Sequence, residues 1–226
     1  MEMHNLFRLT RTVLIIRNGA TRFINGLTVN TPDAPQNAFV DLYGRSIAVI
    51  DQVKLNEEEI LLILAPQFLE RLLTHLKPYR RLAKITIETE KWNVYFDVSN
   101  GYKPEKGEHT IPQKSGQMLL TKKEIPAALS DEAFTLFRLR HGIPLQGIDY
   151  GDEMLLNIDE ILVSFTKGCF LGQEVLARVH NRARPPKKLV VKAEDECTEE
   201  EKRKMTSKCF DSEAKKVYGF VFVKNW

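Results

Sequence analysis

A single cysteine stands between two glycines in the octapeptide KGCFLGQE, residues 167–174. Glycine suits positions where the backbone takes a positive φ or comes close to a ligand, because it has no Cβ. A lysine two residues before a thiol favours the thiolate, which is the nucleophilic and metal-binding form. The octapeptide therefore predicts a ligand-binding loop in which Cys169 is a working thiol. The alternative is a passive cysteine packed in the core, where free cysteines commonly lie.

Basic residues are concentrated in and after this octapeptide. Residues 167–192 contain seven lysines and arginines and one acid, whereas residues 194–201 contain six acids and no base. Guanidinium groups bind carboxylates and phosphates in bidentate fashion, so the basic segment is a candidate anion site. A solvated basic face with no ligand is the competing interpretation.

The whole chain has the composition of an ordinary globular protein. Its 226 residues are 43% hydrophobic and 28% charged, and the formal net charge is +3. No apolar run approaches the roughly 18 residues of a membrane-spanning helix, and the first residues lack the pattern of a secretory signal. The three cysteines are odd in number and lack C-x-x-C spacing, which predicts neither a disulfide framework nor a metal site. We expect a reducing compartment, either the cytoplasm or an organellar matrix.

The apolar periodicity predicts an α+β protein, with helices on one face of a largely antiparallel sheet. A hairpin turn is expected at Gly44-Arg45, and strands 84–89 and 92–98 are expected to pair with each other. Residues 99–117 are expected to be a linker or an exposed loop, and residues 173–179 a helical turn or a short strand. The other expected strands are 12–17, 37–43, 46–55, 60–64, 188–192 and 217–223, and helices are expected at 20–28, from Pro66 to about residue 76, at 131–141 and at 198–205.

The octapeptide resembles the signature Lys-Gly-Cys-Tyr-x-Gly-Gln-Glu of the YgfZ family, with Phe170 in place of the tyrosine. Members of this family are folate-binding proteins related to the glycine-cleavage T-protein and linked to iron–sulfur cluster maintenance. Residues 23–30 (FINGLTVN) are similar to the family's N-terminal Phe-Leu-Gln-Gly-x-Leu-Thr-Asn-Asp segment, and residues 138–144 (RLRHGIP) to its Arg-Ile-Glu-x-Gly-x-Pro segment. The Gly44-Arg45 turn also matches the family pattern.

The resemblance implies a T-protein-like folate-binding fold in three regions. These are an N-terminal α+β, ferredoxin-like subdomain at 1–98, a second α+β subdomain with the octapeptide at 99–186, and a shortened C-terminal β-barrel-like segment at 187–226. Cys169 and Lys167 would form the working pair, with Lys167 activating the thiol at the rim of a cavity. The residues expected to bind or shape the site of the ligand are Gly168, Gly172, Gln173, Glu174, Arg178, Thr28, Arg45 and Arg138.

Three departures from the family pattern bear on the ligand. Val49 stands where the T-protein has an aspartate for its amine-transfer chemistry, although Asp51 would point the same way from a strand. Arg140 stands where the superfamily has a glutamate that accepts hydrogen bonds from the pterin, and a cation cannot accept them. The C-terminal segment from Lys187 onward has only 40 residues, which is short for the family's C-terminal barrel.

The leading hypothesis is a folate-binding accessory protein, rather than a standard enzyme, that supports assembly or repair of iron–sulfur enzymes through Cys169. Tetrahydrofolate is its expected cofactor, and folate and iron–sulfur enzymes or assembly proteins are its expected partners; no membrane partner is expected. A second hypothesis is a tetrahydrofolate-dependent aminomethyltransferase with Asp51 as its carboxylate. A third is an RNA-binding module built on residues 178–192, although a nucleic-acid partner is not favoured. A degenerate scaffold without a ligand is the last alternative.

Overall fold

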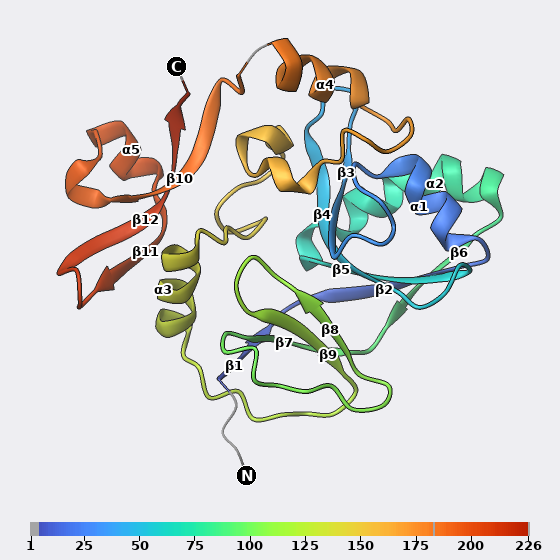
Figure 1. Cartoon of the computed structure of the whole chain (residues 1–226), viewed down its shortest axis with the longest axis horizontal. Coiled ribbons are helices and arrows are strands. Elements are labelled where there is room, and N and C mark those ends of the chain that lie inside the picture. Colours follow the sequence, from blue (N-terminus) through green and yellow to red (C-terminus); the bar gives the residue numbers. More distant parts are fainter. Residues whose placement is uncertain (1–4, 183, 226) are drawn as a thin grey trace.

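The computed structural model describes residues 5–182 and 184–225 (Figure 1). Its central element is a five-stranded antiparallel sheet with the order β3-β4-β5-β2-β6. The strands are β2 (Thr12–Arg17), β3 (Gln36–Val40), β4 (Ser46–Lys54), β5 (Glu59–Leu64) and β6 (Thr86–Glu90). β2 and β5 are nearly continuous apolar runs, because both faces of this sheet are covered.

Two helices cover one face of the five-stranded sheet. α1 (Ala20–Leu27) buries Phe23, Ile24 and Leu27, and α2 (Leu69–Ala83) buries Leu72 and Leu76. These side chains share one hydrophobic cluster with alternate residues of β2 and β5. A 3-10 turn that begins at the expected Pro66 leads into α2. Both helices and their side of the sheet thus follow the apolar periodicity, which confirms the predicted α+β class.

The other face of the sheet packs against a second antiparallel sheet with the order β1-β7-β9-β8. Its strands are β1 (Leu6–Leu9), β7 (Asn93–Asp97), β8 (His109–Pro112) and β9 (Gln117–Thr121). The predicted pairing of strands 84–89 and 92–98 is wrong: β6 pairs with β2, while β7 pairs with β1 and β9. β6 (TIETE) has one apolar residue and β7 (NVYFD) has three, and the sequence does not show that the short link between them joins two different sheets.

The segment 99–117 is not only a linker, because β8 and the start of β9 lie in it. Strands on both sides of residue 98 also share the four-stranded sheet, so the chain does not separate there into two layers. A third sheet, with the order β10-β12-β11, is formed entirely from residues 187–224. Its strands are β10 (Lys187–Ala193), β11 (Thr206–Asp211) and β12 (Lys216–Lys224), and α5 (Glu199–Lys204) packs on it.

α3 (Asp131–His141) connects this C-terminal sheet to the rest of the molecule (Figure 1). Its predicted boundaries are confirmed: Ser130 Oγ accepts a hydrogen bond from Ala133 N at the start, and Gly142 ends the helix with φ 60°. Leu139 packs on Leu189 and Phe220 of the C-terminal sheet, and Phe134 packs into the cluster between the two larger sheets.

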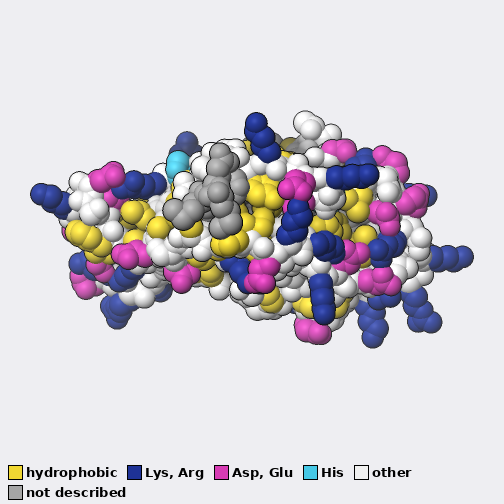
Figure 2. Space-filling view, turned by 90° about the horizontal axis from the view of Figure 1, so that it is seen from below, with side chains coloured by type: hydrophobic (Ala, Val, Ile, Leu, Met, Phe, Trp, Pro, Cys, Tyr) yellow, Lys and Arg dark blue, Asp and Glu magenta, His cyan; other side chains and the backbone are white. Residues whose placement is uncertain are grey.

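Lys and Arg side chains mix with Asp and Glu over the face of the molecule shown in Figure 2, so charge of a single sign does not dominate that face.

Candidate functional site

The octapeptide forms the loop that precedes α4 (Gln173–Arg182), after the 3-10 turn η3 (Glu160–Leu162). We call residues 164–172 the signature loop. It enters with Ser164 N donating to Val29 O at 2.9 Å. Phe170 is 8% exposed and packs with Leu176 of α4 and with Val40 of β3. The loop is therefore fastened to the five-stranded sheet through Phe170.

The two glycines of the loop have different roles. Gly172 has φ 81°, and a Cβ there would collide with the backbone oxygen of Asp41 in the β3–β4 turn. Gly172 thus allows α4 to begin directly on that turn. Gly168 has open space around its Cβ position and no positive φ. The backbone requires glycine only at the second position.

Cys169 is exposed, whereas Cys197 and Cys209 are buried. Gln173 N donates to Phe170 O at 3.3 Å, which closes the turn behind the cysteine. Glu174 lies in the first turn of α4, and both Glu174 and Arg178 are exposed on this helix. The fold thus secures the residues on either side of the thiol and leaves the thiol itself accessible.

Lys167 has partners that the sequence did not suggest. Its Nζ donates to the carbonyl oxygens of Asn25, Thr28 and Asn30, at 2.8, 2.6 and 3.1 Å. These carbonyls lie at and just beyond the C-terminal end of α1, where a cation is favourable because carbonyl groups are left unsatisfied. Burial lowers the pKa of Lys167 to about 8, so the amine is mostly protonated at neutral pH and can donate to all three. The geometry makes Lys167 an anchor of the signature loop.

Thr28 is fully buried within this same region. Its hydroxyl donates to Ile24 O at 2.8 Å and accepts from Asn37 Nδ2 at 3.0 Å. The side chain therefore ends α1 and supports β3, and it is the Thr28 carbonyl that touches the signature loop.

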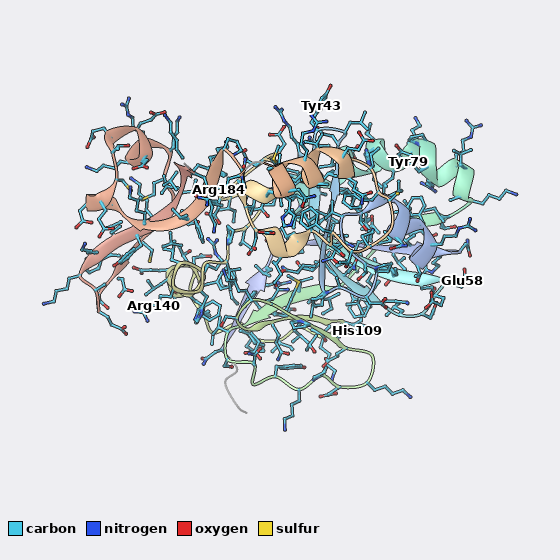
Figure 3. All side chains as sticks on the ribbon, turned by 45° about the horizontal axis from the view of Figure 1, so that its top comes forward. Tyr43, Glu58, Tyr79, His109, Arg140 and Arg184 are labelled. Carbon is cyan, nitrogen blue, oxygen red and sulfur yellow. The ribbon has the colours of Figure 1, made fainter. Side chains whose placement is uncertain are left out.

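The three arginines singled out in the sequence lie in different environments. Arg45 is exposed, and its backbone N–H donates to Asp41 Oδ1 in the predicted turn, where Gly44 has φ 72°. Arg138 is 3% exposed and pairs with Asp149 at 2.6 Å. Arg140 holds Asp211 through two bonds of 3.0 Å and lowers the pKa of that carboxyl to about 2. Figure 3 shows Arg140 on α3 beside the C-terminal strands.

A cavity opens between the two larger sheets and the segment 142–162; we call it the central cavity. It encloses about 820 Å³, including the solvent-open space at its mouth. Its polar lining includes Arg11, Gln36, Asp51, Gln113, Gln146 and Tyr150, and its apolar lining includes Leu9, Ile63 and Phe96. No residue of the signature loop lines it, so the structure does not bring Cys169 to this cavity.

Asp51 is the carboxylate that β4 directs into the central cavity, on the same face of the strand as Val49. Its Oδ1 accepts from Gln113 Nε2 at 2.8 Å and from Gln36 Nε2 at 3.2 Å. Burial raises the pKa of Asp51, and the bond from Gln113 and the charge of Arg11 oppose this rise. Sequence reasoning identified Asp51 by strand alternation, and the structure adds its two amide partners.

Arg11 and Tyr150 are cavity residues that sequence reasoning missed. Arg11 occupies the short link between the buried strands β1 and β2, and a charge in so apolar a context was the available signal. Tyr150 is 8% exposed, and burial raises the pKa of its hydroxyl. Nothing in the local sequence indicates that Tyr150 faces Asp51, because 98 residues separate them.

The basic segment after the octapeptide is partly neutralised. Lys187 pairs with Glu153 at 2.8 Å and Lys192 with Glu201 at 3.0 Å. Those two lysines are therefore engaged within the protein, which reduces the surface that an RNA backbone would contact.

Within residues 5–182 and 184–225, no helix has the length and apolarity to cross a bilayer, and no three His, Cys, Asp or Glu side chains converge as a metal site would require.

The fold is that of the glycine-cleavage T-protein. The chain superposes on the aminomethyltransferase T of the glycine cleavage system from Bartonella henselae with a TM-score of 0.69, over 97% of this chain and 78% of that one, at 11% identity. This likeness confirms the predicted T-protein-like architecture with a shortened C-terminal β segment.

Two curated proteins are similar in sequence, and no protein-family model matches. The chain is 28% identical over 150 residues to the mitochondrial iron–sulfur cluster assembly factor IBA57 homolog of Dictyostelium discoideum, covering 50% of this chain and 35% of that protein. It is 25% identical over 180 residues to an uncharacterized protein of Haemophilus influenzae, covering 74% of this chain and 60% of that protein. The chain thus spans between a third and two thirds of these relatives. Sequence and fold together support the predicted kinship with the YgfZ and T-protein group.

Proposed function

We propose that this chain is a folate-binding accessory protein that supports the assembly or repair of iron–sulfur cluster enzymes, with Cys169 as the working thiol. The observation that carries the proposal is the contrast within the signature loop. Lys167 is fixed to the carbonyls at the end of α1, and Phe170 and Gly172 are fixed against β3 and the β3–β4 turn, whereas Cys169 is exposed. A loop held so firmly around an accessible thiol is suited to presenting that thiol to a partner protein or its cluster.

The relative from Dictyostelium supports the iron–sulfur part of this proposal, because its name describes a cluster assembly factor. The T-protein-like fold supports the folate part, since the central cavity lies between its layers. Arg140 does not take part in holding a folate here, because Asp211 and Glu213 engage it. Asp51, Gln36, Gln113 and Tyr150 are the groups that would hold it.

The cavity's chemistry fits such a cofactor. Asp51 Oδ2 and the Tyr150 hydroxyl have no hydrogen-bond partner in the described part of the chain, and apolar side chains lie around them. A planar ring with polar edges would satisfy both kinds of surface. Bound tetrahydrofolate would supply a one-carbon carrier, while the protein binds and orients the ring.

In this proposal the residues in and around the loop have two roles: some position the thiol, and others contact the partner. Lys167 and Gly172 position the loop, and Gly168 leaves room beside the thiol. Gln173 and Glu174 lie at the start of α4, close to the thiol in sequence. Arg178, one helical turn after Glu174, would attract an anionic group of the partner. Thr28 and Arg138 act through the fold, and Arg45 would contribute a charge near the β3–β4 turn.

Complementation tests the role of the thiol. Cys169→Ser is expressed in a host that lacks its own member of this group, and the activity of an iron–sulfur enzyme is measured. We expect wild type and Thr166→Ala, a change at an exposed residue of the same loop, to restore activity, and Cys169→Ser to fail at an equal protein level. Full activity of Cys169→Ser would remove the thiol from the proposal.

A one-carbon transferase is the second candidate, and the position of Asp51 in the central cavity favours it. A cavity carboxylate with a raised pKa is suited to proton transfer. Formation of methylenetetrahydrofolate from an aminomethyl donor would be assayed with wild type and Asp51→Asn. Turnover that depends on Asp51 would establish this activity, and no turnover would eliminate it.

A further inference from the structure

Arg11 is a cation of the central cavity without an ion-pair partner. Its Nη1 donates to the carbonyl of the adjacent Thr10 at 3.1 Å. In the described part of the chain, no carboxylate oxygen lies within 4.0 Å of its guanidinium nitrogens. Burial lowers the pKa of Arg11, and the charge of Asp51 opposes this effect. Arg11 is half-buried, and charges withdrawn from water are normally paired in proteins. A ligand in the cavity could supply the missing partner.

Asp51 is the complementary group. Both of its amide donors, Gln113 and Gln36, bond to the same oxygen, Oδ1. The second oxygen has no hydrogen bond within the described residues, although the side chain lines the cavity. A carboxylate oxygen can accept more than one hydrogen bond, and Oδ2 is therefore available to a donor in the cavity.

The sheet register sets the spacing between these two groups. Asp51 lies opposite Ile63 of β5, and Ile63 lies opposite Val13 of β2. Arg11 precedes Val13 by two residues, so its side chain starts from the same face of the sheet. Asp51 is two strand spacings from β2, or roughly 10 Å. Both side chains can therefore extend toward one edge of a ring system that lies over Ile63.

Tyr150 approaches the same space from the segment 142–162. Burial raises the pKa of its hydroxyl, and the nearby charge of Asp51 raises it further. That hydroxyl has no hydrogen bond among the described residues, whereas Gln146 of the same segment is engaged with Val49 N at 2.7 Å. Leu9, Ile63 and Phe96 supply apolar surface around these groups.

We propose that Arg11 and Asp51 together recognise the edge of a planar heterocycle that presents a carbonyl beside N–H groups, the lactam–guanidine edge shared by pterins and guanine. Arg11 donates to the carbonyl and Asp51 Oδ2 accepts from the N–H groups. A purely anionic ligand would be opposed by Asp51 and a purely cationic one by Arg11, whereas this edge satisfies both. The inference rests on the proposed folate binding, and it assigns recognition to residues that lie away from Arg140.

In the protein without ligand, the Arg11 guanidinium is partly withdrawn from water and has no ion-pair partner among the described residues. Removing that charge is therefore expected to leave the unliganded fold as stable as before or more stable, a pattern found for binding groups. A structural arginine would behave in the opposite way, because its removal would leave its partners unsatisfied.

The experiment measures calorimetric affinity and thermal unfolding of the full chain with Arg11→Met and Asp51→Asn. The matched controls are Arg8→Met, at an exposed arginine on the neighbouring strand, and Asp33→Asn, at an exposed aspartate. The probes are tetrahydrofolate, guanosine and p-aminobenzoylglutamate, which lacks the pterin. We expect each cavity variant to weaken tetrahydrofolate binding at least tenfold, because a hydrogen bond to a charged group is lost. Both controls should bind as wild type does, and Arg11→Met should have an unchanged or higher Tm.

The outcomes bear differently on the inference and on the proposed folate binding. Equal tetrahydrofolate affinity in wild type and both cavity variants would overturn the inference and leave folate binding standing. Guanosine binding that depends on Arg11 and Asp51, without tetrahydrofolate binding, would support the inference and overturn folate binding. Binding of p-aminobenzoylglutamate as tight as that of tetrahydrofolate, or no binding of either heterocycle, would overturn the inference. A lower Tm of unliganded Arg11→Met would also overturn it, since Arg11 would then be structural.

Discussion

Lys167 Nζ lies 2.6 Å from the carbonyl oxygen of Thr28, although the two residues are 139 positions apart along the chain. This contact joins the signature loop to the end of α1. The charged amine of Lys167 donates hydrogen bonds to backbone carbonyls, so its main role is to anchor the loop. The thiol two residues later is presented by this anchoring.

Replacing Lys167 by Met is expected to destabilise the protein by about 1–3 kcal/mol, because carbonyl groups at the end of α1 lose a charged donor. Urea unfolding measures the change. Lys106→Met, at an exposed lysine, is the control and should change little. An unaltered unfolding midpoint for Lys167→Met would mean that the three carbonyl contacts contribute no net stability.

Gly172→Ala should be far more costly than Gly168→Ala. The first places a Cβ against Asp41 O at φ 81°, whereas the second places it in open space. The left-handed conformation alone costs a non-glycine residue about 1–2 kcal/mol, and the collision adds to this. Thermal unfolding of the two variants gives the comparison. Equal melting temperatures would contradict the close approach of the loop to the β3–β4 turn.

Arg138 and Asp149 form a buried ion pair that also involves the C-terminal sheet, since Ser207 Oγ accepts from Arg138 Nη2 at 2.8 Å. Arg138→Met is expected to cost about 3–5 kcal/mol, because it leaves a buried carboxylate unpaired. The double variant Arg138→Met/Asp149→Asn should recover part of the loss. A double-mutant cycle by urea unfolding measures this coupling, and strictly additive losses would argue against it.

Acid should weaken the attachment of the C-terminal sheet to α3. Arg140 lowers the pKa of Asp211 to about 2, from an ordinary value of 3.8. A lowered pKa in the folded state gives stability that is present above about pH 4 and is lost as the pH falls toward 2. Asp211→Asn should therefore be less stable at neutral pH and lose less between pH 4 and 2. Unfolding midpoints across this range test the prediction, and parallel curves for the two proteins would refute it.

The three thiols should differ in reactivity. Cys169 is exposed, whereas burial raises the pKa of Cys197 and of Cys209. Ellman's reagent should modify one thiol per native chain rapidly, and all three after unfolding in guanidinium. Native Cys169→Ser should show no rapid reaction. Rapid modification of that variant would place another thiol at the surface.

The sequence by itself determined the local elements and the identity of the loop. Apolar periodicity predicted α1, α3 and the start of α2, because Pro66, Ser130 and Gly142 act on the backbone next to them. The predicted end of α2 near residue 76 is wrong, since the helix continues to Ala83. Strand alternation was enough to place Asp51 beside Val49 on one face. The octapeptide indicated a T-protein-like fold, which the superposition confirms.

The tertiary structure alone decided which distant groups meet. Local patterns could not show that β6 and β7 enter different sheets, because two strands joined by a short link are equally consistent with a hairpin. They also could not show that Lys167 reaches the end of α1 or that Arg11 and Tyr150 share a cavity with Asp51. Such contacts depend on strand order and packing between residues about 40 to 140 positions apart. Lys167, two residues before Cys169 in sequence, is therefore directed by the fold toward carbonyl groups that no local pattern reveals.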